Sequence, residues 1–177
     1  GDSNDFGELV QERFDFMGGM GNGVRAVFAG GYKQTSPAAT FYKIIDTVNV
    51  QSTGNATKFG ELSATRGRTA NTSNSIRGLN LGGGPAPDGR TNIIEFITLS
   101  TEGNSQDFGD LLAPVLSLAA CSSSTRAVQP GSAPSPGAVN TIQYVTIATT
   151  GNAVDFGDMT VAQNGASSIS DVNGGLG

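Results

Sequence analysis

The chain has 177 residues, of which 10 are Lys or Arg and 15 are Asp or Glu, and its formal net charge is −5. It contains no His, no Trp and one Cys, which excludes a Ser-His-Asp triad, a His-ligated metal, a CxxC zinc site and an internal disulfide. The acidic balance argues against binding nucleic acid through its phosphates. No apolar run approaches the ~20 residues of a membrane span. We therefore expect no cofactor, no nucleic-acid partner and no membrane insertion.

Short β-strands are the elements that the chain predicts, taken in order. Runs rich in Ile, Val, Thr, Tyr and Phe favour a pleated, half-buried surface, and no window shows sustained helical periodicity. The predicted strands cover residues 24–30, 44–50, 76–81, 93–100, 125–129 and 142–149. Loops are predicted over residues 33–39, 85–91 and 133–139, where Pro, Gly and Ser collect. The chain should be almost wholly β.

One segment recurs four times along the chain. Each copy starts with Gly and a short polar residue and continues into a Phe-Gly-acid segment. Its Phe residues stand at steps of 53, 49 and 48, and they are Phe6, Phe59, Phe108 and Phe156. We interpret 1–177 as a single repeat domain, with repeats at about 1–53, 54–102 and 103–150 and a partial repeat at 151–177. Phe59, Phe108 and Phe156 should occupy equivalent buried positions.

The order of the signals within each period suggests a known repeat class. A strand ends in Gly-Gly, a loop follows, the next strand carries Phe96 or Tyr144, and a Thr-Ala-Arg-like corner stands at Ala64-Thr65-Arg66. This order resembles a kelch repeat. The Trp usual in kelch blades is missing, and the recurring Phe takes its place. The resemblance implies an all-β fold of kelch-like β-propeller type, with about three full blades and parts of a fourth.

The exact amino-acid sequence of some runs indicates a narrower resemblance. The run from Tyr144 to Ala153, followed by residues 155–158, is similar to repeats in virion proteins of tailed phages, as are residues 27–32 and 120–126. This implies a non-enzymatic structural or binding protein of a phage tail or fibre, located on the virion. The alternative is an extracellular adhesive or filament-forming protein that is not viral. An oxidase on a kelch propeller is disfavoured, because that resemblance implies copper held partly by His.

Variable loops on a rigid repeat scaffold are where binding residues tend to lie. Loops rich in Ser, Thr, Asn and Gly suit hydrogen bonding to a host-surface glycan or to a neighbouring protein. The candidate ligand or partner residues are Tyr32, Lys33, Gln34, Asp88 and Arg90. No catalytic, cofactor-binding or metal-binding residue is predicted, and Cys121 is interpreted as a structural thiol.

The acid that closes each Phe-Gly-acid segment allows two interpretations. One is a row of functional carboxylates around a central channel, and the other is a structural ion pair or a strand-end hydrogen bond in every repeat. Repetition favours the structural interpretation, because a catalytic site needs different groups in different roles. The acids are Glu8, Glu61, Asp110 and Asp158, and the candidate basic partners are Arg13, Arg25, Arg66, Arg77 and Arg126.

The ends of the repeat pattern predict association. The chain opens at the first position of a repeat and stops soon after a Gly-Gly pair. We expect the open edges to be covered by more of the same polypeptide or by a neighbouring copy, in preference to a closed four-bladed ring. Unpaired strand edges invite association, so an isolated monomer should be prone to aggregate. The expected partners are other structural proteins or copies of the chain itself.

Overall fold

A computed structural model describes residues 2–14, 16–35, 37–85, 89–116, 119–134 and 137–163. Every helix or strand assigned within these ranges is a β-strand, which confirms the all-β prediction. Nowhere in these ranges does a helix have the length and apolar character to cross a membrane.

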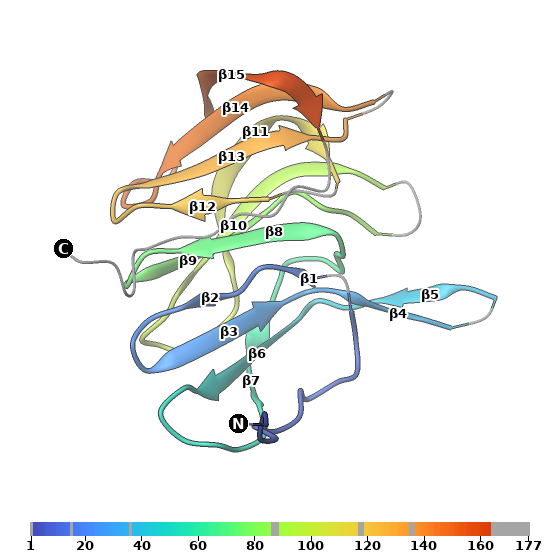
Figure 1. Cartoon of the computed structure of the whole chain (residues 1–177), viewed down its shortest axis with the longest axis vertical. Helices are drawn as coiled ribbons and strands as arrows, with labels where there is room; N and C mark the ends of the chain where they lie inside the picture. The colour runs from blue at the N-terminus through green and yellow to red at the C-terminus, as the bar shows by residue number, and fades with distance from the viewer. Residues whose placement is uncertain are drawn as a thin grey trace.

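Three four-stranded antiparallel units are stacked along the long axis of the molecule (Figure 1). In each unit, the order of the strands across the sheet is the same as their order along the chain. The first sheet contains β2 (Met20–Gly21), β3 (Arg25–Ala29), β6 (Ile44–Asn49) and β7 (Thr57–Glu61). The second contains β8 (Thr69–Ser73), β9 (Arg77–Leu81), β10 (Thr91–Thr98) and β11 (Gln106–Val115). The third contains β12 (Cys121–Ser122), β13 (Arg126–Ser132), β14 (Val139–Thr146) and β15 (Val154–Gln163).

Three short strands lie outside these units. β1 (Phe16–Met17) pairs in parallel with β8 and extends the second sheet to five strands. β4 (Tyr32–Gln34) and β5 (Ala39–Phe41) form a hairpin that projects from the first sheet between β3 and β6 (Figure 1). The loop predicted over residues 33–39 is therefore partly wrong. The hairpin forms because Tyr32 faces Phe41 across it and Thr35 closes a tight turn onto Ala38.

The six predicted strands are present as β3, β6, β9, β10, β13 and β14, with ends displaced by a few residues. A short polar side chain shapes the same turn in every sheet by accepting backbone N–H bonds two and three residues further on. This residue is Asn22, Asn74 or Ser123. Of the other two predicted loops, residues 86–88 and 135–136 lie outside the described ranges.

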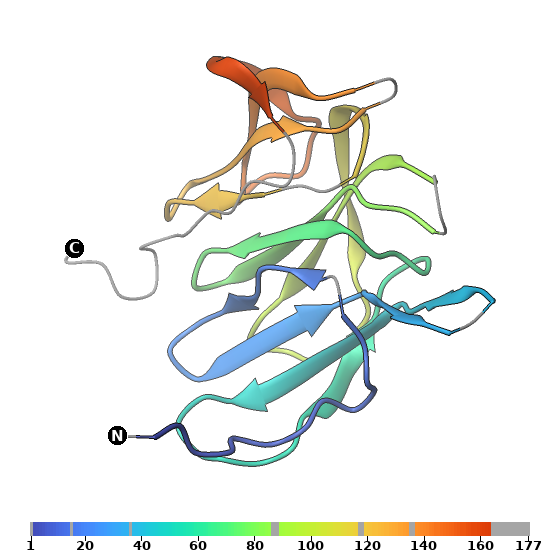
Figure 2. The same ribbon diagram turned by 45° about the vertical axis from the view of Figure 1, so that its right-hand side comes forward.

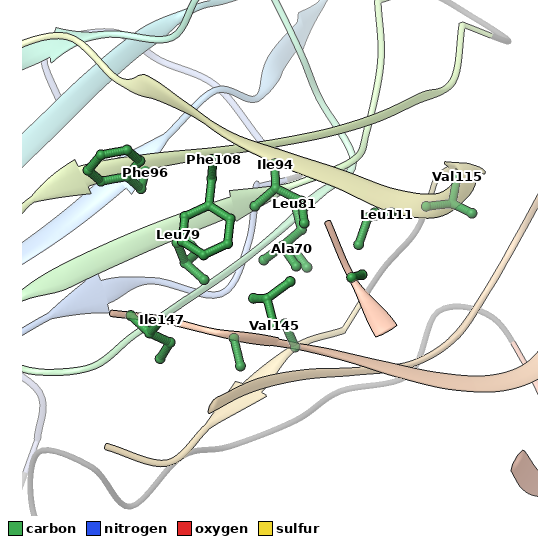
Figure 3. Packing of buried hydrophobic residues seen from close by; sticks show 13 residues of the cluster. Ala70, Leu79, Leu81, Ile94, Phe96, Phe108, Leu111, Val115, Val145 and Ile147 are labelled. Carbon is green, nitrogen blue, oxygen red and sulfur yellow. The ribbon is translucent and has the colours of Figure 1, made fainter. Parts of the chain in front are cut away.

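The apolar core lies between the sheets, in two clusters. One joins the first sheet, including Phe59, to Ile97 and Leu99 of the second sheet and its following turn. The other joins the second sheet, including Phe108, to Val145 and other residues of the third sheet (Figure 3). Phe59 is 3% exposed and Phe108 is 2% exposed, as predicted. The prediction for Phe156 is wrong: its side chain is 56% exposed, because no further sheet covers it within the described residues.

One contact joins each of the first three Phe-Gly-acid segments to the Gly-Asn turn of the next repeat. The Gly N–H donates to the Phe carbonyl oxygen at 2.8, 2.9 and 2.7 Å, and the Asn Oδ1 accepts the N–H of the acid at 3.1, 3.1 and 3.0 Å. We call this contact the Gly-Asn latch. Its three copies join residues 6–8 to 54–56, residues 59–61 to 103–105 and residues 108–110 to 151–153.

The latch explains the Gly of the Phe-Gly-acid segment. A Cβ at Gly60 would collide with the carbonyl oxygen of Gly103, and one at Gly109 would collide with that of Gly151. Only Gly allows the turn of the next repeat to approach so closely.

Candidate functional site: an aromatic pocket at the β4–β5 hairpin

The β4–β5 hairpin encloses a surface pocket of about 300 Å³, the size of a small-ligand site. It contains two of the five residues predicted from the sequence, Tyr32 and Gln34. The lining residues are Tyr32, Gln34, Pro37, Ala38, Ala39, Phe41 and Arg68.

Two aromatic rings line the site, and a third packs against one of them from outside the pocket. Tyr32 and Phe41 stack with ring centroids 4.9 Å apart and planes inclined by 19°. Phe14 meets Tyr32 edge-on at 4.6 Å, and the two residues also exchange backbone hydrogen bonds of 2.8 and 2.9 Å. Backbone pairing on both sides therefore holds Tyr32 in place, although Phe14 is 47% exposed.

The segment Gly67-Arg68 packs against the rings. A Cβ at Gly67 would lie 3.0 Å from Cδ1 of Tyr32 and 3.1 Å from Cε1 of Phe41, so a side chain at this position would push against both rings. Arg68 has a φ of 57°, which is uncommon for a residue with a side chain. This conformation places its guanidinium carbon 5.9 Å from the centroid of the Tyr32 ring. Strained backbone of this kind clusters at binding sites, which singles out Arg68 as a candidate binding residue.

The other predicted residues lie elsewhere. Lys33 follows Tyr32 on β4, so the alternation of a strand turns it away from the pocket. Its Nζ lies 2.5 Å from Oε2 of Glu12, and this hydrogen bond raises the pKa of Lys33. Arg90 donates from Nε to the carbonyl oxygen of Ala133 at 3.0 Å. Asp88 is outside the described residues.

Sequence reasoning missed Phe41, Arg68 and Phe14 as parts of this site. Phe41 stands just beyond the predicted loop, and its pairing with Tyr32 could have been found by treating that loop as a hairpin. Arg68 carries no signal in the sequence, because its role depends on its backbone conformation.

Among the ion pairs of the described residues, Glu61 is the one repeated acid that takes part, so the expectation of an ion pair in every repeat is wrong. Glu61 lies between Nζ of Lys43, at 2.7 Å, and Nζ of Lys58, at 2.6 Å, and these hydrogen bonds lower the pKa of Glu61 to about 2. Three of the arginines predicted as partners pair with other acids, whereas Arg77 bonds to carbonyl oxygens and Arg126 lies over the ring of Tyr144. Arg13 pairs with Asp46, a residue that the sequence analysis did not single out.

The second such pair is Arg66 with Glu95, and both pairs are buried between strands. Side-chain exposure is 0% for both members of the first pair and 1% and 3% for those of the second. These groups are structural, because a reactant cannot reach them. In the described part of the chain, no three His, Cys, Asp or Glu side chains are grouped as a metal site would require.

Comparison with known proteins bears on the fold. No protein-family model matches the chain, and no curated protein matches it. Solved structures do match: 128 chains resemble it, so the architecture is a recurrent one. Among them is the structure of YjhT, with a TM-score of 0.65 and 8% sequence identity over 82% of this chain and 52% of that one. The chain thus spans about half the length of YjhT, and at this identity the likeness concerns the fold alone.

Proposed function

We propose that the chain is a non-enzymatic binding module in which the stacked sheets hold the hairpin pocket for a carbohydrate ligand. The observation that carries this proposal is the stacked pair Tyr32 and Phe41 beside the guanidinium of Arg68. An aromatic ring offers an apolar face to the C–H face of a sugar, and a polar rim can bond its hydroxyls. Gln34 and Arg68 supply that rim.

Preorganisation supports the same proposal. The rings are fixed by backbone pairing on both sides, so binding would order few side chains and lose little conformational entropy. Within the pocket lining, Arg68 is the charged side chain, and the remaining residues are apolar or neutral. This composition suits hydroxyl-rich ligands.

A glycan array probed with the full chain tests the proposal, followed by titration with the best oligosaccharide. We expect binding that Tyr32→Ala abolishes and Arg68→Ala weakens at least several-fold. Thr40→Ala is the matched control, because Thr40 is an exposed residue of the same hairpin and pairs with Lys33, on the side away from the pocket. Absence of binding, or binding that survives Tyr32→Ala, would refute the assignment.

The proposal extends to the architecture and the setting of the chain. We propose that each four-stranded sheet is a blade of a kelch-like β-propeller. The equivalent strand order of the three sheets and the repeated Gly-Asn latch support this. An experimental structure of a longer polypeptide or assembly would show whether such sheets close into a ring.

The resemblance of the repeats to tail proteins supports a place on a phage virion, where the hairpin pocket would contact host-surface glycans. The alternative is a secreted adhesive or filament-forming protein. Mass spectrometry of purified particles and of secreted fibres would separate the two: the chain should be found in the particles.

A further inference from the structure

The outer face of the third sheet is an uncovered copy of a face that the first two sheets bury. Phe156 is 56% exposed on β15, whereas Phe59 and Phe108 at the same repeat position are 3% and 2% exposed. Figure 2 shows β15 at the outer end of the stack. The ring of Phe156 contacts only the edge of Tyr144 among the rings of the described residues, with centroids 5.8 Å apart. This face is built to be covered in the way the other two are.

The Gly-Asn latch is also open at this end. Within the described residues, no Gly-Asn turn bonds to the backbone of Phe156 or Asp158, although the three earlier segments each hold one. A Cβ at Gly157 would meet none of the described atoms within 4 Å, whereas one at Gly109 would collide with the next turn. The geometry for a partner is present and the space is open.

A side-chain contact gives a second, independent sign. Nη1 of Arg25 donates to the carbonyl oxygen of Leu99 at 3.4 Å, and Nη1 of Arg77 donates to that of Ile147 at 3.0 Å. Each bond joins one sheet to the next. Arg126 holds the same position in the third sheet, where it is exposed and lies over the ring of Tyr144 at 4.6 Å. Its counterpart would be a carbonyl group of a following sheet.

The first sheet, at the opposite end of the molecule, carries an exposed apolar residue and a Gly-Asn turn that match this face. Val50 stands where Leu99 and Ile147 stand in later repeats, and its N–H makes the same bond to the turn before the second strand of the sheet. Leu99 and Ile147 are 0% exposed, but Val50 is 43% exposed. Beside it lies the turn Gly54-Asn55, which among the described residues of other segments is bonded to residues 6–8. These residues belong to no described strand, so the turn has no sheet behind it.

We propose that a second copy of this chain docks head to tail on the third sheet. β15 of one copy would take the Gly54-Asn55 turn of the next copy in place of that copy's own residues 6–8. Residues 155–158 read Asp-Phe-Gly-Asp and residues 5–8 read Asp-Phe-Gly-Glu, so the exchange adds no charge. Arg126 would then reach the carbonyl oxygen of Val50. The contact repeats one that the chain makes twice within itself, and because its two sides differ it can continue from copy to copy.

Sedimentation velocity over a wide range of concentrations tests association of the full chain. We expect a mass that grows beyond the dimer as concentration rises, and loss of this growth in Phe156→Asp. Val154→Asp is the matched control: Val154 is on the same strand and is 53% exposed, but its counterparts Thr57 and Gln106 stay exposed within the chain. A wild-type chain that stays monomeric, or two variants that behave alike, would overturn the proposal.

Two glycine variants should act in opposite directions. Gly157→Ala puts a methyl group where the incoming turn must lie, so association should fall. Gly7→Ala loosens residues 6–8 from the Gly54-Asn55 turn, because its Cβ would collide with the carbonyl oxygen of Gly54, so association should rise. Effects of the same sign in both variants would contradict the exchange. Circular dichroism would confirm that both variants keep their sheets.

Cross-linking tests the direction of docking. Two proteins, Asn55→Cys and Asp158→Cys, each in a Cys121→Ser background, should form a disulfide-linked dimer when mixed and oxidised. Neither should form one alone, because the head of one copy meets the tail of the next. Cross-linking by either protein alone to the same extent as the mixture would overturn the head-to-tail arrangement.

Discussion

The first two sheets and the third sheet hold the segment that follows the repeated Phe by different chemistry. In each sheet, a side chain in the third strand accepts the N–H of the residue four positions after the repeated Phe. Asp46 accepts it from Val10 at 3.3 Å, and Glu95 accepts it from Ser63 at 3.0 Å. In the third sheet, the acceptor is the neutral side chain of Gln143, which takes the N–H of Leu112 at 2.9 Å. We call this group the strand anchor.

The difference between charged and neutral anchors follows from the residue that faces each of them. Arg13 and Arg66 neutralise the acids of the first two anchors, but the residue at that repeat position is Val115 in the next copy. A buried carboxylate without its arginine would cost several kcal/mol, so loss of the arginine favours an uncharged acceptor. The amide of Gln143 uses its second function to donate to Oε1 of Gln129 at 2.7 Å. All three anchors thus provide a hydrogen-bond acceptor. The acceptor is a charged carboxylate only where an arginine lies opposite it.

The sharpest way to break the comparison is to neutralise one charged anchor. Glu95→Gln keeps the acceptor for the Ser63 N–H but leaves the guanidinium of Arg66 buried without a counter-charge. We expect a loss of about 3–5 kcal/mol in the free energy of unfolding, the cost of breaking a buried ion pair. Urea denaturation of the two proteins measures it.

Glu102→Gln is the control for this experiment. Glu102 is 54% exposed and lies 3.7 Å from Arg25, so its neutralisation should change the unfolding free energy by no more than about 0.5 kcal/mol. If Glu95→Gln behaved like this control, the charged anchor would not depend on its pairing.

Copying the third anchor into the second sheet should recover most of that loss. In Arg66→Val/Glu95→Gln, the new amide faces Asn80, its partner across β9 and β10. Oδ1 of Asn80 is buried and has no hydrogen-bond partner among the described residues, so it can accept from the amide. We expect the double variant to recover more than half of the loss, because it removes the uncompensated buried charge, while the volume that Val leaves unfilled at position 66 keeps it below the wild type. A double-mutant cycle in urea measures the coupling, and additive losses would contradict the comparison.

Loss of the neutral anchor should lower the free energy of unfolding less than loss of a charged one. Gln143→Met keeps the volume but removes the acceptor of the Leu112 N–H and the donor to Gln129. Leaving buried polar groups unsatisfied costs about 1–3 kcal/mol, below the expected cost of unpairing Arg66. The unfolding free energy in urea again gives the result, and a loss equal to that of Glu95→Gln would remove the distinction between the anchors.

Local patterns predicted the strands and the repeat, because β-branched runs and Gly turns act within a few residues of themselves. The burial of Phe59 and Phe108 followed from the repeat. The same reasoning failed for Phe156, because burial depends on a following sheet and the repeat pattern alone does not supply one. Spacing within the chain therefore identifies equivalent positions but does not determine whether another sheet covers them.

The strand anchor and the pocket were beyond the sequence for a different reason. Asp46 and Glu95 stand inside apolar strand runs, where nothing marks them as partners of arginines about 30 residues away. The Phe-Gly-acid segments drew attention because they repeat visibly, although the backbone of the acid, and not its carboxylate, makes the repeated contact. The pocket required the backbone conformation of Arg68 and the pairing of Tyr32 with Phe41.

The smallest expected effect tests whether an ion pair outside the core follows the same rule as the anchors. Two lysines, Lys43 first and Lys58 second, hold the pKa of Glu61 at about 2, below its ordinary value near 4.5. Because the folded-state pKa is the lower one, the stabilisation is fully present above about pH 4.5 and is lost as pH falls toward about 2. Solvent screens this site, so the gain should be far smaller than that of Arg66 with Glu95.

Urea melts of wild type and Glu61→Gln should differ slightly at pH 6 and converge as pH approaches 2. Asp110→Asn is the control, because Asp110 holds the same repeat position and makes no ion pair among the described residues. A difference for Glu61→Gln that persists unchanged at low pH would show that the two lysines do not stabilise the fold through this carboxylate.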